Sequence, residues 1–340
     1  MKRKLVGLVL AAVIGAVSVT GCSKLDNDDV VAEVGGTKIT AGVANFYARF
    51  QQSQYETYYS SFLGNDMWSG EAEEGKTYED SVKETIMNNL QSMYVLDMHK
   101  KDYDITLTEE DEAAIKKAAD AFGEANTLED KELISGDSDT VEEVLRLLTV
   151  QEKMREAITA DVDTEVSDEE AAQKSMKYVY FSFNKTGDDG NTTQMTDEEK
   201  EALKKDAEAF RQGAEDAEDF PAYATEKGYE AANLTFDSST TSPAQELIKA
   251  ADALAEGELT DVVEGPSGYY VAKVTSLLDR EATDTKKESI ISERKQTMFN
   301  EQIEKWLDEE KVTVHKSVWK KINFVKQGVT IKDTGSEESK

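Results

Sequence analysis

The sequence predicts an α+β protein in which helical stretches at both ends of the chain flank a smaller mixed segment. Only three prolines occur among 340 residues, and all of them lie between residues 221 and 266, so the rest of the chain can form long helices. Apolar residues recur every three or four positions before residue 170 and after residue 285. By contrast, the run "KYVYFSF" at 177–183 has the composition and alternation of a buried strand.

The first 21 residues form a basic and then apolar leader. "MKRK" is followed by "LVGLVLAAVIGAV", which is shorter than the roughly 20 apolar residues that a transmembrane helix needs. The small residues of "SVTG" then lead to Cys22. This pattern resembles the lipobox of bacterial lipoproteins, in which the cysteine is lipidated and becomes the new N-terminus. We therefore expect a signal peptide at 1–21, lipidation of Cys22 and attachment to the outer face of the bacterial cell membrane.

Composition and charge exclude several classes of function. The formal net charge of −31 argues against a nucleic-acid partner, because phosphate binding needs a basic patch. Cys22 is the only cysteine, so an internal disulfide and a cysteine metal cluster are excluded. The acidic clusters at 26–29 and 188–190 lack the ligand spacing of a calcium loop. We expect neither a metal nor a cofactor.

The N-terminal part of the mature chain is predicted to be a helical module. "VVAEVGGTKIT" indicates two short strands joined by a tight turn at Gly35 and Gly36. Helices are then expected from Thr40, from about Tyr78, from Thr108 and from Val141, and capping patterns such as "TYED" and "TEED" mark two of these starts.

The first of these helices carries an aromatic stripe at helical spacing. Packing of the stripe against neighbouring helices is the favoured interpretation, although a surface that binds other polypeptides would use the same residue types. The stripe consists of Val43, Phe46, Tyr47, Phe50, Tyr58 and Phe62.

The mixed segment begins at the strand at 177–183. A capped helix is predicted from Thr196, a short helix that ends at Gly228, a third helix in "SPAQELIKAADALAEGEL" and a closing strand in "SGYYVAKVTSLLD". From about Thr285 a helical stripe returns, and we expect this C-terminal helix to pack on the N-terminal module. The mixed segment would then be an insertion.

Three stretches give the chain a resemblance to extracytoplasmic foldases of the PrsA and SurA type, which carry a parvulin-type (PpiC-like) peptidyl-prolyl isomerase domain. "VVAEVGGTKIT" resembles the segment that leads into the first helix in this family. "AEAFRQGAEDAEDFPAYATEKG" resembles a parvulin segment in which a buried phenylalanine, here Phe220, begins a helix. "LAEGELTDVVEGPSGYYVAKV" resembles the C-terminal part of a parvulin domain, which leads into its last strand, and it is the most specific of the three stretches. The resemblance implies a helical chaperone module with an inserted parvulin-like α+β domain.

The chain departs from the family at the residues that carry activity. Active parvulins have one histidine on the first strand and another near the start of the last strand. Here Tyr178 or Val179 stands at the first place and Tyr270 at the second, while His99 and His315, the only two histidines, fall outside the domain. Asp237 is the only acidic residue between Glu230 and Glu246.

The tyrosines are weak substitutes for the missing histidines. Rotation about an X-Pro bond needs no covalent step, so tyrosine hydroxyls could contribute hydrogen bonds to the twisted amide. Tyr180 and Tyr270 are therefore the weak catalytic candidates, and core packing is favoured over catalysis for both. Whether the chain is an enzyme is left open.

These expectations combine into one domain plan and one leading function. The plan has a signal peptide at 1–21, a helical module at 22–172, a parvulin-like domain at 173–282, a C-terminal helix and segment at 283–326, and a polar tail at 327–340. The leading function is a membrane-anchored extracytoplasmic folding factor for unfolded or secreted client polypeptides, with a weak or inactive isomerase domain. The alternatives are an active peptidyl-prolyl isomerase and a binding or structural lipoprotein of the cell envelope.

Overall fold

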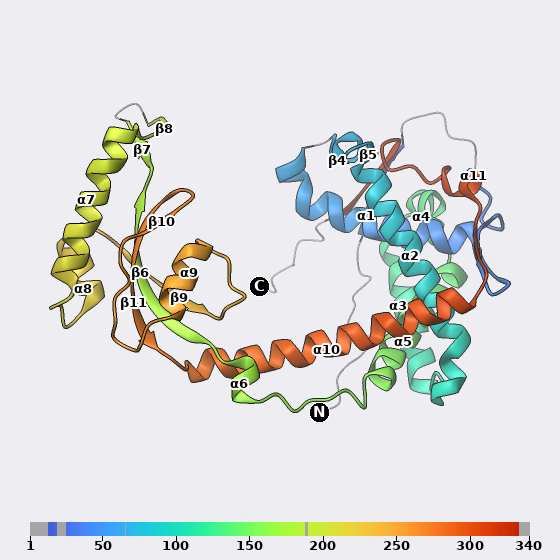
Figure 1. The fold of residues 1–340 in the computed structure, drawn as a ribbon. Helices are drawn as coiled ribbons and strands as arrows, with labels where there is room; N and C mark the ends of the chain where they lie inside the picture. The colour runs from blue at the N-terminus through green and yellow to red at the C-terminus, as the bar shows by residue number, and fades with distance from the viewer. Residues whose placement is uncertain (1–12, 19–24, 65, 188–189, 333–340) are drawn as a thin grey trace, which may run out of the picture. The chain divides into compact units, whose positions relative to one another are not determined.

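The chain folds as two compact units. The computed structural model describes residues 13–18, 25–64, 66–187 and 190–332 (Figure 1). Unit 1 contains the chain up to Val162 and from Lys295 onward, and unit 2 contains Asp163–Arg294. Unit 2 is thus inserted in the sequence of unit 1, as the α+β plan with an inserted domain predicts. The residue boundaries given above for that plan stay predictions.

Unit 1 is mainly helical, and its helices begin at the polar side chains that the sequence pointed to. Thr77 and Thr108 each form a reciprocal capping box, with Asp80 and Asp111 respectively. Thr127 caps a further helix that was not predicted, and Asp137 caps a helix that begins at Ser138, three residues before the expected Val141. The helices are α1 Ala41–Leu63, α2 Tyr78–His99, α3 Glu109–Ala125, α4 Leu128–Ile134, α5 Ser138–Ile158 and α11 Lys316–Trp319, with 3-10 turns η1 Met67–Ser69 and η2 Lys100–Tyr103.

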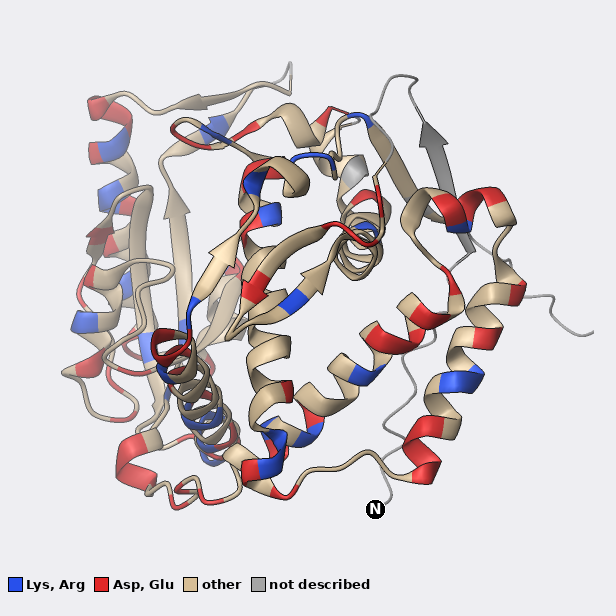
Figure 2. Ribbon diagram, turned by 90° about the vertical axis from the view of Figure 1, so that its right-hand side faces the viewer, with Lys and Arg blue, Asp and Glu red and all other residues tan. Residues whose placement is uncertain are grey.

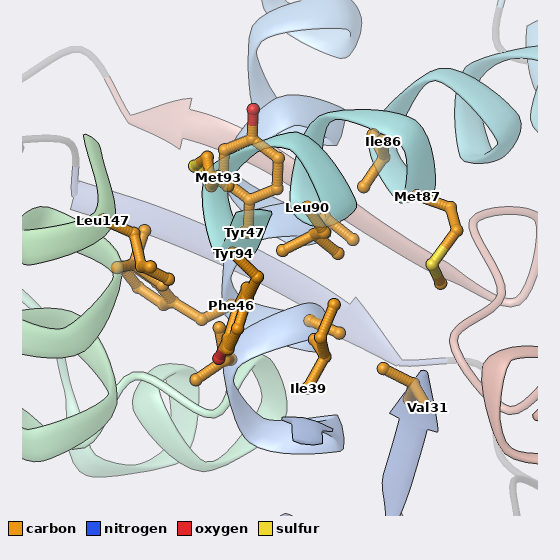
Figure 3. Packing of buried hydrophobic residues seen from close by; sticks show 14 of the residues in the cluster. Val31, Ile39, Phe46, Tyr47, Ile86, Met87, Leu90, Met93, Tyr94 and Leu147 are labelled. Carbon is orange, nitrogen blue, oxygen red and sulfur yellow. The ribbon is translucent and has the colours of Figure 1, made fainter. Parts of the chain in front are cut away.

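A small sheet and the C-terminal helix complete the core of unit 1. Strands β2 Val30–Val34 and β3 Thr37–Thr40 form the predicted hairpin, in which Gly35 and Gly36 both have positive φ, and β12 Val312–Val314 pairs with β2. Leu90 and Met93 of α2 pack beside Phe46 of α1 (Figure 3). Helix α10 (Arg280–Glu309) contributes Phe299 and Trp306 to the same cluster, as expected for a C-terminal helix that packs on this module.

The segment after α10 is attached through a buried ion pair of α2. Lys83 donates to the backbone carbonyls of Trp319 and Ile322, and its amine lies 3.8 Å from the carboxylate of Glu79. Glu79 in turn accepts from the backbone N–H of Phe324 at 2.8 Å. Burial lowers the pKa of Lys83, and the Glu79 carboxylate opposes this shift. These bonds hold the C-terminal segment onto unit 1.

Part of the leader lies within the described residues. β1 Val13–Ser18 pairs antiparallel with β13 Gln327–Lys332. Cys22, the expected lipidation site, lies outside the described residues, as do 1–12 and the rest of 19–24. Within the described residues, every helix is either too short or too polar to span a lipid bilayer. Two further two-stranded sheets are formed by β4 Glu71–Glu73 with β5 Lys76–Thr77, and by β7 Asn184–Thr186 with β8 Thr192–Gln194.

Unit 2 is built on a four-stranded antiparallel sheet of order β10-β11-β6-β9. Helices α7 and α8 share the apolar cluster on one face of the sheet, and α9 shares the cluster on the other. The predicted first and last strands are present as β6 and β11, whereas β9 and β10 were not predicted. The elements are α6 Asp168–Ala171, β6 Lys174–Ser182, α7 Asp197–Ala214, α8 Phe220–Glu226, β9 Ala231–Phe236, α9 Gln245–Asp252, β10 Val263–Gly265 and β11 Gly268–Ser276.

Acidic side chains recur along the helices of both units (Figure 2). They lie mostly on exposed positions, and several occupy first helical turns, for example Glu109 and Glu110 in α3. Negative charge near a helix N-terminus is favourable because it opposes the helix dipole. Part of the large negative charge therefore stabilises the helices that carry it.

Candidate functional site

The sheet register of unit 2 brings three tyrosines to one face. Tyr270 of β11 lies directly opposite Tyr180 of β6, and Ala272 lies opposite Tyr178. Because side chains alternate along a strand, Tyr178 and Tyr180 share the face of Tyr270, whereas Val179 packs in the cluster on the opposite face. Of the two first-strand positions that the sequence left open, only Tyr178 can face Tyr270.

The three rings form one aromatic cluster. Tyr180 stacks on Tyr270 with ring centroids 5.0 Å apart and planes 27° apart, and Tyr178 lies 6.0 Å from Tyr270. The hydroxyl of Tyr180 donates to the backbone carbonyl of Ser267 at 2.7 Å. Tyr180 is 38% exposed, whereas Tyr270 is only 2% exposed. Tyr180 thus covers Tyr270 from the solvent side.

Tyr270 is enclosed by other neighbours as well. A Cβ atom placed on Gly265 would lie 2.8 Å from the Tyr270 ring and 2.9 Å from the side chain of Ala244, so these three groups are in close contact. Burial raises the pKa of Tyr270, a hydrogen bond with Ser267 opposes that shift, and the two neighbouring tyrosines add to it. The phenol is therefore neutral at physiological pH and cannot act as a base.

This geometry limits what the tyrosine cluster can do chemically. An isomerase site needs an open apolar pocket for the proline ring and donors directed at the twisted amide. Here the hydroxyl of Tyr180 already donates to the protein's own backbone, and the ring of Tyr270 is only 2% exposed between its neighbours. The contacts are those of a packed core with one exposed edge.

Neither histidine lies in unit 2, as the sequence predicts. His99 stacks on Trp306 with ring centroids 4.2 Å apart, and its Nδ1 lies 2.8 Å from a carboxylate oxygen of Asp102. His315 lies 3.7 Å from Glu33. Both histidines belong to unit 1, where the contacts of His99 connect α10 with the end of α2.

Asp237 organises the end of β9. One carboxylate oxygen accepts from the backbone N–H of Ser239 at 2.8 Å, and the other accepts from the side chain of Gln173 at 2.8 Å and lies 3.4 Å from the amine of Lys286. It follows Phe236, which pairs with Lys174, about 20 Å along β6 from Tyr180. Asp237 is thus a structural residue at the far end of the sheet from the tyrosine cluster.

The stability of unit 2 is expected to depend on the ionisation of Asp237. Burial acts to raise its pKa, but the bonds from Ser239 and Gln173 and the charge of Lys286 outweigh burial, and the net pKa lies below the ordinary value of 3.8. A carboxyl group with a lowered pKa stabilises the fold above its unfolded-state pKa and loses this contribution as the pH falls through the folded-state pKa. Asp237→Asn should therefore lower the denaturation midpoint of unit 2 at pH 7, and the difference from wild type should disappear at strongly acidic pH. Equal midpoints at pH 7, measured by urea denaturation, would contradict this role.

The second half of α1 exposes a patch of large apolar side chains, here called the α1 patch and defined as Tyr58, Tyr59, Phe62 and Leu63. Phe62 is 89% exposed and Tyr58 is 63% exposed. The favoured interpretation of the aromatic stripe, packing on neighbouring helices, is correct for Phe46 and Tyr47 and wrong for Tyr58 and Phe62. From Thr57 to Leu63 the described side chains of α1 are exposed whichever face of the helix they occupy, so this end of α1 extends beyond the neighbours on which Phe46 packs.

A series of ring contacts connects the α1 patch to the core of unit 1. Tyr59 lies 5.7 Å from the ring of Tyr55, which in turn contacts Trp68, and Trp68 packs on Phe324 in the core. Exposed contiguous apolar surface on a soluble protein commonly marks a site for another polypeptide. Sequence spacing pointed to Tyr58 and Phe62, but Tyr59 and Leu63 were missed because they lie outside the spacing of the stripe.

Comparison with known proteins finds similarity to parvulin-type domains and to PrsA foldases. Residues 180–288 match the family described as the PPIC-type PPIASE domain, which covers most of the sheet of unit 2. The chain is 25% identical over 304 residues to the "Foldase protein PrsA" of Clostridium botulinum, covering 84% of this chain and 88% of that protein. It is also 25% identical over 325 residues to the protein of the same name from Caldanaerobacter subterraneus, covering 92% and 96%. A crystal structure of PrsA from Lactococcus lactis covers 86% of this chain and 97% of its own at 18% identity, with a TM-score of 0.34.

Proposed function

We propose that this chain, which is similar to PrsA foldases and matches the PPIC-type PPIASE domain over residues 180–288, is an extracytoplasmic folding factor for unfolded client polypeptides. Its binding function resides in unit 1, where the α1 patch contacts apolar segments of the client. The parvulin-type domain has weak or no isomerase activity. A lipid on Cys22 anchors the protein to the outer face of the bacterial cell membrane.

The observation that carries the proposal is the exposure of the α1 patch. An unfolded chain presents apolar side chains that a native protein would bury, and their transfer onto another apolar surface is favourable by about 25 cal/mol per Å². The patch supplies such a surface at the end of a helix whose first part is packed in the core of unit 1. The net charge of −31 keeps such a complex soluble through mutual repulsion.

The proposed anchor rests on the leader and on Cys22. One acyl chain binds a membrane only marginally, whereas the two or three chains of a bacterial lipoprotein hold a protein stably. An anchored folding factor would meet secreted chains as they emerge from the membrane. Metabolic labelling with a fatty-acid analogue tests this point, because a Cys22→Ser variant should incorporate no label.

The function is tested by mixing the mature chain with a chemically unfolded, aggregation-prone protein and following light scattering. We expect the mature chain to slow aggregation at a stoichiometry near one binding protein per client. A protein of equal net charge that lacks apolar surface serves as the control. Failure to slow aggregation of several such clients would leave an envelope binding or structural lipoprotein as the better description.

The proposed weakness of the isomerase is tested separately on a short proline peptide. Uncatalysed isomerisation takes tens of seconds at 25 °C, so a rate enhancement is easy to detect. We expect the mature chain to leave the rate close to this background, and Tyr180→Phe and Tyr270→Phe to change nothing. A rate well above background that falls in either variant would show that the phenols take part in catalysis and would overturn this part of the proposal.

A further inference from the structure

Unit 1 contains a groove of about 1080 Å³ that is separate from the α1 patch. It is lined by the end of α3, by α4, by the start of α5 and by the segment at 25–27. This volume is at the upper end of the range for small-molecule sites, which suits a ligand larger than a single metabolite. All the lining residues belong to unit 1.

The walls of the groove combine apolar and acidic side chains. Leu25, Ala119 and Leu128 supply apolar lining, and the side chain of Leu128 is 71% exposed. Five carboxylates line the groove against a single amine, that of Lys131, and all five acidic residues are exposed. They are Asp26, Asp120, Glu124, Glu132 and Asp137.

Several lining residues are held by the fold, and others are available. Lys131 donates to the carbonyl of Gly123 at 3.0 Å, and Asp137 accepts from the backbone N–H of Thr140 at 3.0 Å as the cap of α5. Glu124 and Glu132 form no ion pair with any other described residue. Lys131 and Asp137 are therefore held in place, and Asp120 pairs with Lys116 of the same helix at 3.5 Å, while Glu124 and Glu132 are available to cations.

The distribution of the carboxylates favours a polycation with separated charges. Among the described residues, no three His, Cys, Asp or Glu side chains are grouped closely enough to hold a metal ion. Lysine and arginine side chains, in contrast, combine an apolar stem with a charged end, and they can cover apolar lining while they reach carboxylates at its edge. An exposed leucine beside these carboxylates adds a contact for an apolar side chain.

We propose that this groove binds a basic, amphipathic peptide segment that carries lysine or arginine residues between apolar ones. The inference rests on the proposed function, in that the segment belongs to an unfolded client, and it adds a preference for basic clients to the apolar contact at the α1 patch. The groove supplies the electrostatic part of binding, and the α1 patch supplies the apolar part.

The test is fluorescence anisotropy with two labelled twelve-residue peptides, one alternating leucine with lysine and one alternating leucine with glutamate, added to the mature chain. The lysine peptide should bind more tightly, and its affinity should fall as salt is raised, because exposed charges are screened over about 10 Å at 0.1 M ionic strength. Asp120→Lys with Glu124→Lys, one turn apart on α3, should weaken binding of the lysine peptide by about tenfold. Leu128→Ser should weaken it further.

A matched control separates the groove from general charge. Glu152→Lys with Glu156→Lys makes the same change of charge at the same spacing on an exposed part of α5 away from the groove, and it should leave binding nearly unchanged. An equal loss in both double variants, or equal binding of the two peptides by the wild type, would overturn the proposal. Failure of the folding-factor proposal is a different result, namely that the wild type does not slow client aggregation although it binds the lysine peptide.

Discussion

A chain that carries Tyr58→Ser and Phe62→Ser is expected to lose most of its capacity to keep unfolded clients in solution. Both side chains are largely exposed, so their removal costs the fold little. Burial of each ring against a client is worth about 1.5–3 kcal/mol, so the double variant should bind clients at least tenfold more weakly. Light scattering of an aggregating client measures this as the concentration of chain needed for half-maximal suppression.

The control for this variant removes exposed apolar side chains elsewhere. Leu277→Ser with Leu278→Ser changes two residues of unit 2 that are each about two-fifths exposed. This control should suppress aggregation as well as wild type does. If both double variants lose activity equally, or if neither does, then the α1 patch is not the client-binding surface. Thermal denaturation of each variant shows that a loss of activity does not come from unfolding.

Phe181→Ala is expected to unfold or severely destabilise unit 2 while unit 1 stays folded. Phe181 is 2% exposed, and its ring lies 4.7 Å from that of Tyr229 and 5.7 Å from that of Phe210. Replacement of a buried phenylalanine by alanine costs about 3–5 kcal/mol, a large part of the stability of a small domain. Phe181→Leu, which keeps most of the volume, should cost much less.

The distribution of aromatic residues makes the two units separately measurable. The three tryptophans, Trp68, Trp306 and Trp319, all lie in unit 1, so tryptophan fluorescence reports on that unit. In Phe181→Ala the fluorescence transition should stay where it is in wild type, while amide hydrogen exchange in β6 and β11 should become fast. A fluorescence transition that shifts as much as the exchange does would mean that the two units unfold together.

Most helices of this fold could be predicted because their starts are encoded locally. Thr77, Thr108 and Thr196 each lie three residues before an acidic partner, and the structure has a reciprocal capping box at all three. The missed helix α4 has a similar start at Thr127, but its seven residues are too few to show a clear apolar period. Helix α10 begins at Arg280, five residues before the expected Thr285. Its first turn is mostly polar, so the apolar spacing did not mark this part of the helix.

The missed strands and the misread stripe have physical causes. β10 has only three residues, and β9 contains Ala231, Ala232 and Asn233, which have low strand propensity, so pairing with β6 rather than local preference forms it. Likewise, the position of Tyr178 opposite Tyr270 depends on the sheet register, which only the pairing of β6 with β11 fixes. The exposure of Phe62 depends on where the neighbouring helices end. None of these properties is encoded within a short stretch of sequence.

The most direct test of the account places a photoreactive phenylalanine analogue at position 62 and irradiates the mature chain in the presence of an unfolded client. Position 62 is the most exposed of the apolar residues in the α1 patch, so the substitution preserves the fold. The same analogue at position 152, on an exposed part of α5, is the control. We expect the client to cross-link several-fold more at position 62 than at position 152. Equal cross-linking at both positions, or none at 62 while aggregation is still suppressed, would contradict the assignment of client binding to the α1 patch.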